Sequence, residues 1–492
     1  MQTRLLETGF PIAVVWIALL AIAIPFVAGA PDAGPGTAGS PGVDAAEQSN
    51  VGTAPTHPAA AAAGFSPGTA GNVTIPEKAT GSGSAAPHAG GTATVDGRSY
   101  DTVQAAVSAA NPGDSVVLEG VFAERVVVNT DGVRLIASDD GAVIDGGGEG
   151  RVLTVAEENV TVEGVWIRNS GDEVGDEDAG VFVDGNDTTL ETVLITDSAY
   201  GIWIDGVDDA TIADVRIEGR ENVYPITDRG NGIHLYAADG TTIRNSEITG
   251  VRDGIYFSWS TEVLAANNSI WNTRYGVHYM YSDHNRLIDN VALDNGVGYA
   301  LMVSEGLEVR NNTAVRNRDR SGHGILAKDI EESTIADNVL VENRNGLYVY
   351  NAQDNDLVDN LVLANDVGIH LTAGSEGQHV AGNSFVENHQ PVYTTTKQVL
   401  IWNGTDRGNY WSAARTTDLT GDGKSEVRHR PAGLVERLVH EHPQAAVFAD
   451  SPAFEVVRLA ESSFPVIDSP GVVDATPATE PHHDWRKYAR TS

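Results

Sequence analysis

Two successive segments decide the fold: GIYFSWSTEVLAANNSIWNTRY (residues 254–275) and GVHYMYSDHNRLIDNVALDNGV (residues 276–297). Each begins with a glycine followed by an apolar residue, and this pair recurs along the chain. The recurring glycines are Gly232, Gly254, Gly276, Gly298, Gly324, Gly346 and Gly368, spaced by 22 residues except for one step of 26. A short unit cannot bury its own apolar face. The fixed period therefore predicts a solenoid of stacked coils.

The residues after each glycine alternate in character. One and three places on they are apolar, as in Ile255 and Phe257, or Val277 and Tyr279. This two-residue period is typical of β-strands. A second apolar position recurs eleven places after the glycine, at Ile243, Leu287, Val309, Ile335 and Leu357. Each coil then holds two or three short strands, which predicts an all-β fold, a right-handed parallel β-helix of about 22-residue coils.

Asparagine marks the corners of the predicted coils. It recurs fourteen places after the glycine at Asn268, Asn290, Asn312, Asn338 and Asn360, and nineteen places after it at Asn295, Asn317, Asn343 and Asn365. Asparagine tolerates left-handed backbone and bonds locally in turns. Stacked identical amides also bond to one another along parallel stacks. We interpret these residues as structural and none of them as catalytic.

Composition narrows the class of protein. Asp and Glu number 68 against 31 Lys and Arg, a net charge of −37. Nucleic-acid binding needs basic surface, so this balance argues against a nucleic-acid partner. It fits an acidic surface screened by high salt, and we hypothesise a halophilic source. The chain has no cysteine, which excludes disulfides and thiolate metal sites.

The chain divides into five predicted parts. Residues 11–28 are an uncharged apolar run, so residues 1–30 are expected to be a signal peptide or an N-terminal membrane anchor. Either one predicts an extracytoplasmic location for the rest. Residues 31–90 are rich in Ala, Gly and Pro and are expected to be a disordered linker. The β-helix is expected over 91–398, a C-terminal cap or docking region over 399–474, and a disordered tail over 475–492.

Both ends of the β-helix are expected to be covered, because an open end exposes unpaired strand edges. Residues 101–110 predict a short helix that caps the N-terminal end. In the C-terminal region, residues 434–440 and 452–463 have helical patterns. The stretch from Asp418 to Glu426 is similar to a calcium loop, but its twelfth position is His429, where calcium loops carry a glutamate. We predict an acidic turn there rather than a calcium site.

The chemistry is predicted on one outward face. Residues two and four places after the glycine point outward, and several are aromatic, histidine or methionine instead of the usual small polar residues. Met280 and Met302 hold the same place on adjacent coils, and His278 lies on the same face. Thioether sulfur and neutral imidazole suit Cu(I), so Met280, Met302 and His278 are candidate ligands. The other members of this face are His234, Tyr236, Tyr256, Tyr348, Tyr350 and His370.

Three other interpretations of this face stay open. The residues outside the ligand group form an aromatic patch that could dock a protein partner, together with Trp411 further along the chain. Alternatively they pack beneath a loop. An enzyme is a third possibility, because many β-helices cleave polysaccharides. The outward face has no repeated pair of carboxylates, however, and only Asp184 and Asp205 hold equivalent positions on it.

The ordered motifs resemble a known family. They are DGIYF (253–257), RYGVHYMYS (274–282), GYALM (298–302), HGILAKD (323–329), GLYVYNA (346–352), GIHLTAGSE (368–376) and RGNYW (407–411). Over about residues 92–475 the chain resembles the NosD family, accessory proteins for nitrous oxide reductase maturation. One departure is Arg428-His429-Arg430-Pro431, where the family has a run similar to Pro-Tyr-Arg-Pro.

The resemblance implies a pectin-lyase-like β-helix outside the cytoplasm that is not an enzyme. It implies an ABC ATPase, a membrane permease and a copper chaperone as partners, and nitrous oxide reductase as client. It also implies transient copper and a role in assembling the copper–sulfide centre of the reductase. The alternatives are a carbohydrate-active lyase or glycosidase and a surface glycan-binding scaffold.

Overall fold

The computed structural model describes residues 60–61, 73–75, 90–372, 374–402, 407–433, 435, 438, 442–448, 451–463 and 470–489. The predicted signal peptide or anchor at 1–30 lies outside the described residues, as does most of the predicted linker at 31–90. Within the described residues, no helix is long and apolar enough to span a bilayer.

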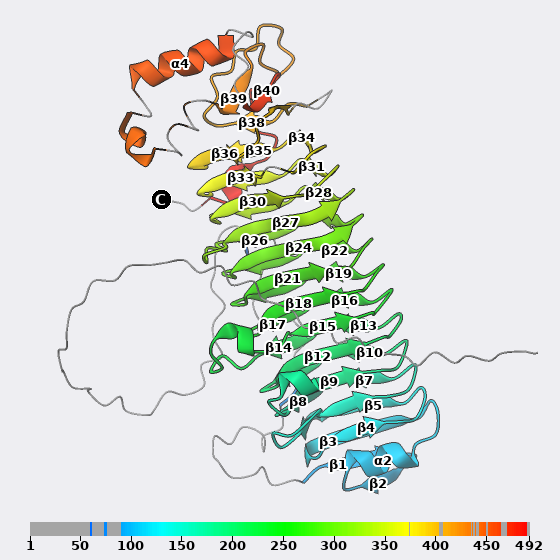
Figure 1. Ribbon diagram of the computed structural model, residues 1–492. Helices are drawn as coiled ribbons and strands as arrows, with labels where there is room; N and C mark the ends of the chain where they lie inside the picture. The colour runs from blue at the N-terminus through cyan, green and yellow to red at the C-terminus, as the bar shows by residue number, and fades with distance from the viewer. Residues whose placement is uncertain are drawn as a thin grey trace, which may run out of the picture. The chain divides into compact units, whose positions relative to one another are not determined.

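The coils form a right-handed parallel β-helix with three walls, as the glycine period predicts (Figure 1). Wall 1 is a twelve-stranded parallel sheet. Its strands are β4 (Val126–Val128), β6 (Leu153–Val155), β9 (Ala179–Val183), β12 (Tyr200–Asp205), β15 (Ile233–Tyr236), β18 (Asp253–Ser258), β21 (Tyr275–Met280), β24 (Val297–Glu305), β27 (His323–Glu331), β30 (Asn345–Tyr350), β33 (Val367–Leu371) and β36 (Gln390–Thr394).

Walls 2 and 3 are the two halves of a second sheet, joined through β3 (Ser115–Ala123) and β5 (Arg134–Asp145). Wall 2 continues with β7 (Thr161–Glu163), β10 (Thr189–Glu191), β13 (Thr211–Ala213), β16 (Thr242–Arg244), β19 (Leu264–Ala266), β22 (Arg286–Ile288), β25 (Glu308–Arg310), β28 (Thr334–Ala336), β31 (Asp356–Val358) and β34 (His379–Ala381). Wall 3 continues with β8 (Val165–Arg168), β11 (Leu194–Thr196), β14 (Arg216–Glu218), β17 (Glu247–Thr249), β20 (Ser269–Trp271), β23 (Val291–Leu293), β26 (Thr313–Val315), β29 (Val339–Val341), β32 (Leu361–Leu363), β35 (Ser384–Val386) and β38 (Tyr410–Trp411).

The glycine repeat has a steric cause. Each glycine of wall 1 lies directly against the next coil, so a side chain at Gly254 would place its Cβ 2.4 Å from the carbonyl oxygen of Gly276. The same close approach recurs at Gly276, whose Cβ would lie 2.5 Å from the Gly298 oxygen. Only glycine fits such a position. The period read from the sequence is therefore the period of the coils.

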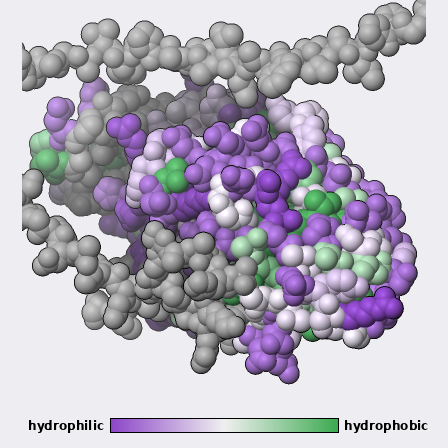
Figure 2. Space-filling model, turned by 90° about the horizontal axis from the view of Figure 1, so that it is seen from below, coloured by the Kyte–Doolittle hydropathy of each residue, from purple (hydrophilic) through white to green (hydrophobic). Residues whose placement is uncertain are grey.

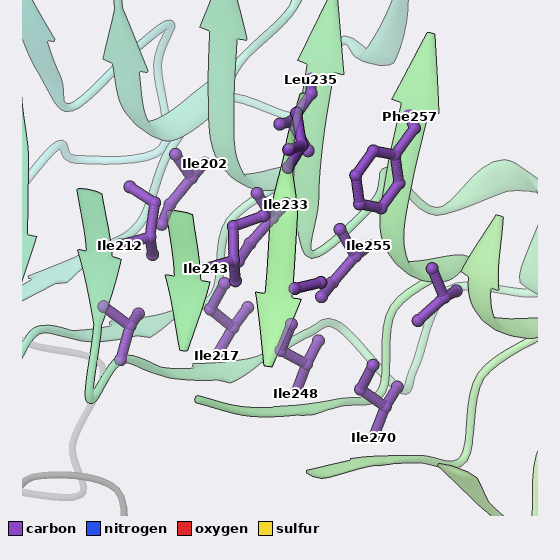
Figure 3. Close-up of a cluster of buried hydrophobic side chains, with 14 of the residues drawn as sticks. Ile202, Ile212, Ile217, Ile233, Leu235, Ile243, Ile248, Ile255, Phe257 and Ile270 are labelled. Atoms are coloured by element: carbon purple, nitrogen blue, oxygen red, sulfur yellow. The ribbon is translucent and has the colours of Figure 1, made fainter. Parts of the chain in front are cut away.

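The core fills the space between the three walls (Figure 3). Ile233 and Leu235 point into it from β15, and Ile255 and Phe257 from β18; all four are fully buried. Isoleucines of walls 2 and 3, such as Ile243 of β16, meet them there. The positions one, three and eleven places after the glycine are thus the inward ones, as predicted.

Two columns of buried asparagine run along the stack. The side-chain amide of Asn268 donates to Oδ1 of Asn290 at 3.0 Å, and Asn290 donates to Asn312 at 3.0 Å. The hydrogen bonds continue toward the C-terminal end of the stack through Asn338, Asn360, Asn383 and Asn409. The left-handed backbone belongs to the residue before each amide, for example Asn267 and Asn311, so the column residues bond between coils instead of making the turn themselves.

The N-terminal end is capped as predicted. β1 (Thr92–Val95) pairs antiparallel with β2 (Arg98–Tyr100) and β3, and α2 (Val103–Ala109) follows. The side chain of Thr102 accepts a hydrogen bond from the amide of Ala105, and Glu124 accepts from the first two helical amides. Seen from this end, the visible surface is mostly hydrophilic (Figure 2).

At the C-terminal end, β37 (Val399–Ile401), β39 (His429–Ala432) and β40 (Gly471–Asp474) form a three-stranded sheet, and α4 (Pro452–Ser463) matches the predicted helical pattern. The remaining described elements are short 3-10 helices: η2 (Val174–Asp176), η3 (Ile226–Asp228), η4 (Pro443–Phe448) and η5 (Trp485–Lys487). The longer step between Gly201 and Gly232 is a loop that contains η3.

The C-terminal tail differs from its prediction. Residues 475–492 were expected to be disordered, but 475–489 lie against the last coils. The amide of His482 donates to Oγ of Ser384 at 3.0 Å, and Nε2 of His483 bonds the carbonyl of Asp359 at 2.9 Å. The composition of the tail is polar, but its aromatic residues Trp485 and Tyr488 pack against apolar residues of wall 3. The sequence pattern did not predict this contact.

Candidate metal and docking face on wall 1

Aromatic and imidazole rings stack on the outer face of wall 1. The first ring stack consists of Trp203, His234, Tyr256 and His278, two places after successive glycines, with ring centroids 3.9, 4.8 and 4.8 Å apart. The second consists of Tyr348, His370 and Tyr393, with centroids 4.5 Å apart at both steps. Ala300 and Leu326 hold the equivalent places between the two stacks.

His278 ends the first ring stack and has one nitrogen without a partner. Its Nδ1 lies 3.1 Å from Oδ2 of Asp253, while its Nε2 is buried and has no hydrogen-bond partner in the part of the chain that the structure describes. The side chain was predicted to face outward. It does, but neighbouring rings cover it and the residue is only 7% exposed. A buried polar atom without a partner is costly, which points to a function for Nε2.

Asp253 determines which nitrogen of His278 carries the proton. Burial alone would raise the pKa of Asp253, but hydrogen bonds from His278 and Arg274 outweigh it and lower the pKa. Nε of Arg274 donates to Oδ1 of Asp253 at 2.8 Å, and the carboxylate is fully buried. An ionised carboxylate only accepts hydrogen bonds, so Nδ1 of His278 donates, and in the neutral ring Nε2 keeps a free lone pair. This is the arrangement that orients histidine as a metal ligand.

Two other histidines of wall 1 have the opposite arrangement. The side-chain amide of Asn231 donates to Nδ1 of His234 at 3.2 Å, and that of Asn345 donates to Nδ1 of His323 at 2.9 Å. The lone pair on Nδ1 is therefore occupied, and Nε2 of each ring carries the proton. Burial lowers the pKa of both His234 and His323 to about 3, so both rings are neutral at ordinary pH.

The two methionines lie where the spacing predicts. Met280 of β21 is directly opposite Met302 of β24 in the register of wall 1, and both side chains are half-buried. Met302 packs against a small apolar cluster of Val297, Ala300 and Leu326 beside the end of the first ring stack. Strand neighbours are about 4.8 Å apart, and residues two places apart on one strand about 6.5–7 Å. His278, Met280 and Met302 thus form one group.

The predicted docking residues separate by exposure. Tyr236 and Tyr350 are exposed, at 46% and 43%, whereas Tyr256, Tyr348 and His370 are half-buried in the ring stacks. His234 is buried and presents little surface to a partner. The exposed members therefore lie along the edge of wall 1, four places after the glycines, rather than at its centre.

Trp411 was predicted to dock a partner, and this prediction is wrong. Its side chain is 2% exposed, it stacks on Phe385 with ring centroids 4.2 Å apart, and its Nε1 donates to Oδ2 of Asp474 at 2.9 Å. The RGNYW motif closes the last coil of the β-helix. A tryptophan can be buried in a core or exposed for docking, and the sequence pattern alone did not distinguish the two for Trp411.

Three further features were missed from the sequence. Asp253 holds His278, and it could have been found as the only acidic residue directly before a wall 1 glycine in the coils from Gly232 to Gly368. Trp259 and Tyr281, five places after their glycines, are exposed and stacked with centroids 4.7 Å apart. Both have positive φ, which is rare for bulky residues. They extend the exposed aromatic edge beside Met280.

Carboxylates gather at two other places. Asp184 and Asp205 follow directly after the paired residues Val183 and Ile204, and burial, with the charge of Asp184, raises the pKa of Asp205. Asp418, Asp422 and Glu426 offer oxygens within 4.8 Å of one another, all exposed. Backbone amides of Gly421 and Gly423 donate to Asp418 and lower its pKa, so this turn is satisfied by its own backbone.

The fold and motifs can be compared with known proteins. Residues 214–415 match the family model described as periplasmic copper-binding protein (NosD). A protein of Pseudomonas aeruginosa described as a probable ABC transporter binding protein NosD is 37% identical over 353 residues, covering 68% of this chain and 82% of the relative. The chain belongs to the NosD family. The resemblance expected from the ordered motifs is confirmed.

A second NosD relative, from Stutzerimonas stutzeri and of the same description, is 35% identical over 356 residues, covering 69% of this chain and 81% of the relative. The part that matches the NosD model contains His278, Met280, Met302 and the second ring stack. Among solved structures, a family 28 exopolygalacturonase of Yersinia enterocolitica is similar at 11% identity and a TM-score of 0.45, covering 62% of this chain and 76% of that one. The Streptococcus pneumoniae adhesin PfbA is similar at 15% identity and a TM-score of 0.42, covering 59% and 87%.

Proposed function

We propose that this protein acts outside the cytoplasm as a copper-binding accessory factor. It accepts Cu(I) on wall 1 and works with an ABC transporter in assembling the copper–sulfide centre of nitrous oxide reductase. The family description as periplasmic copper-binding protein and the relatives' description as ABC transporter binding proteins support this proposal. Copper is the cargo here, and the protein itself catalyses no bond cleavage.

One observation carries the proposal: the free lone pair on Nε2 of His278. The nitrogen is buried among rings, the opposite nitrogen is fixed by Asp253, and no group of the described residues satisfies it. The thioethers of Met280 and Met302 lie on the same outer face. Neutral imidazole and thioether are soft ligands suited to Cu(I). Because both methionine side chains are flexible, three arms from these points can converge on one ion without movement of the backbone.

The exposed aromatic edge is the proposed docking surface for the copper chaperone, the client reductase or the transporter. It consists of Tyr236, Trp259, Tyr281 and Tyr350, and it adjoins the methionines. Aromatic residues are more frequent in protein interfaces than on the rest of the protein surface, so an exposed aromatic group of this kind favours an interface. The half-buried rings of Tyr256, Tyr348 and His370 support this edge from behind. A partner seated there would lie beside the proposed copper ligands.

The test is a titration of purified protein with Cu(I) against a competing chelator under anaerobic conditions. We expect the double variant Met280→Ala with Met302→Ala to bind Cu(I) at least tenfold more weakly and to support little nitrous oxide reduction in cells. Its melting temperature should change little, since both side chains lie on the outer face. His323→Gln is the matched control, because its Nδ1 already accepts a hydrogen bond from Asn345. Wild-type affinity and maturation in the double variant would rule out this site.

A second variant tests the role of Asp253. Asp253→Asn preserves the shape of the side chain but removes the charge that orients His278. Loss of such a supporting carboxylate typically weakens metal binding about 10- to 100-fold. The variant also leaves Arg274 without its ion pair, so its folding must be checked by circular dichroism. If folded Asp253→Asn binds Cu(I) like wild type, the charge of Asp253 does not prepare His278 as a copper ligand.

A further inference from the structure

The outer surface of wall 3 changes character along the stack. The last residue of each wall 3 strand points outward. In β14 and β17 it is Glu218 or Thr249, both polar and half-buried. From β20 to β35 it is apolar in six consecutive strands. These residues, Trp271, Leu293, Val315, Val341, Leu363 and Val386, are here termed the apolar stripe.

The apolar stripe is covered, although it lies outside the coils. The neighbouring inward residues, such as Ile270 and Leu340, belong to the central core, whereas the stripe belongs to a separate cluster. Its members are nevertheless 0–6% exposed. Strand alternation excludes burial against the central core. Other segments of the chain must therefore lie on the stripe.

The C-terminal tail covers part of it. Trp485, Tyr488 and Ala489 pack against the stripe cluster, and His482 and His483 attach this segment to Ser384 and Asp359 of the last coils. Six strands of a wall extend over about 24 Å. The five residues from Trp485 to Ala489, three of them in η5, extend over about 10 Å at a rise of about 2.0 Å per residue. These five residues are too short to cover the whole stripe.

The other described residue on the stripe is Ala60. It lies more than two hundred positions before Trp271 in the sequence, has helical backbone with Ala61, is fully buried, and belongs to the same cluster. Ala61, by contrast, is exposed. The sequence around it, His-Pro-Ala-Ala-Ala-Ala-Ala-Gly, combines a proline start, the best helix former and a glycine stop. Alanine also lets a backbone approach an apolar surface closely.

We infer that the apolar stripe of wall 3 is a docking surface for the chain's own alanine-rich segment at Ala60. The predicted linker at 31–90 is then fastened to the β-helix at Ala60 instead of joining it first near residue 90. The distance between any N-terminal anchor and the β-helix is set by the residues before 60. This inference does not depend on copper.

The absence of native cysteine allows a direct test on the full chain. Ala60→Cys and Ala61→Cys differ by one position, one buried and one exposed. We expect a maleimide to label Ala60→Cys at least tenfold more slowly than Ala61→Cys in the native protein at high salt, and both equally after unfolding. Equal native rates would overturn the inference. So would slow labelling of Ala60→Cys that becomes fast on dilution, because the surface would then belong to a second copy.

A change on the wall tests the same contact from the other side. Val315→Arg places a charge in the stripe, and Thr249→Arg places one at the equivalent outward position of the polar part of wall 3. Combined with Ala60→Cys, Val315→Arg should speed labelling at least fivefold, and Thr249→Arg should leave it unchanged. Melting curves identify any variant that fails to fold, in which case Leu363→Ser replaces Val315→Arg. No effect of folded wall variants on labelling would contradict docking on the stripe.

Discussion

On wall 1, the hydrogen-bond partner of a histidine determines which of its ring nitrogens carries the proton. His234, His278 and His323 all lie on the same sheet, yet an amide donates to Nδ1 in His234 and His323 and a carboxylate accepts from it in His278. The first arrangement leaves a proton on Nε2 and a neutral spacer between rings. The second leaves a lone pair. The proposed copper ligand is thus distinguished by Asp253, not by the histidine itself.

The buried histidines predict a loss of stability in acid. Burial, then the charges of His370 and Arg344, lowers the pKa of His323 to about 3, whereas the unfolded value is about 6.5. The unfolded state therefore binds the proton first, and stability falls as pH drops from about 6.5 toward 3. We expect His323→Gln to reduce this slope by up to about 1.4 kcal/mol per pH unit, measured by urea unfolding at several pH values. His389→Gln, at an exposed position, should keep the wild-type slope. An unchanged slope in His323→Gln would contradict neutral burial.

At the scale of elements, the asparagine columns connect coils that are otherwise held by short strands. Each amide both accepts from the coil before it and donates to the coil after it, and all of its neighbours are buried. Bonds that polarise one another in a row strengthen cooperatively. The columns also satisfy backbone groups at the corners, such as the carbonyl of Leu287, which Asn312 bonds at 2.7 Å. The three-residue strands of walls 2 and 3 depend on these corners for their register.

Removing one asparagine side chain from the column should lower the free energy of unfolding much more than removing an exposed asparagine side chain. Asn312→Ala leaves the buried amide of Asn290 and the carbonyl of Leu287 without their partners. Each such group costs about 1–3 kcal/mol, so we expect a loss of about 2–6 kcal/mol in the free energy of unfolding. Asn311→Gly is the control, since Asn311 is exposed and glycine accepts its positive φ. Similar unfolding midpoints for the two variants would mean that the column is not a source of stability.

Much of this architecture could be predicted from the sequence, because its cause is local and repeated. A 22-residue glycine period follows from close contact between coils at Gly254 and its equivalents, and the alternation after it shows which side chains face the core. The opposition of Met280 and Met302 follows from the same count. Contacts between distant segments have no such period. The pairing of Asp253 with His278, the burial of Trp411 against Asp474 and the attachment of the tail through His483 were therefore missed.

The whole molecule carries a large excess of negative charge. The net charge is −37, and ion pairs such as Arg316 with Asp294 neutralise only a minority of the 68 acidic residues. Unpaired carboxylates on adjacent coils repel one another across spacings of about 4.8 Å. Salt shortens the range of this repulsion from about 10 Å at 0.1 M to about 3 Å at 1 M. The fold should therefore depend on its ionic environment.

This charge predicts that salt stabilises the protein. We expect the melting temperature to rise steadily between 0.1 M and 2 M KCl, because screening relieves repulsion in the folded state more than it weakens half-exposed ion pairs. Sucrose at equal osmolarity is the control, since it carries no charge. A melting temperature that is independent of KCl would remove the hypothesis of a halophilic source.

The position of Asp474 makes the end of the β-helix depend on a segment that is synthesised late. The first asparagine column ends at Asn409, whose amide and side chain, with Nε1 of Trp411, all donate to this one buried carboxylate. Asp474 arrives more than sixty residues later, within the last twenty positions of the chain. During synthesis the coils can stack one after another, but the final donors stay unpaired until residue 474 has been added. A chain cut before residue 474 would leave these donors of Asn409 and Trp411 without their acceptor.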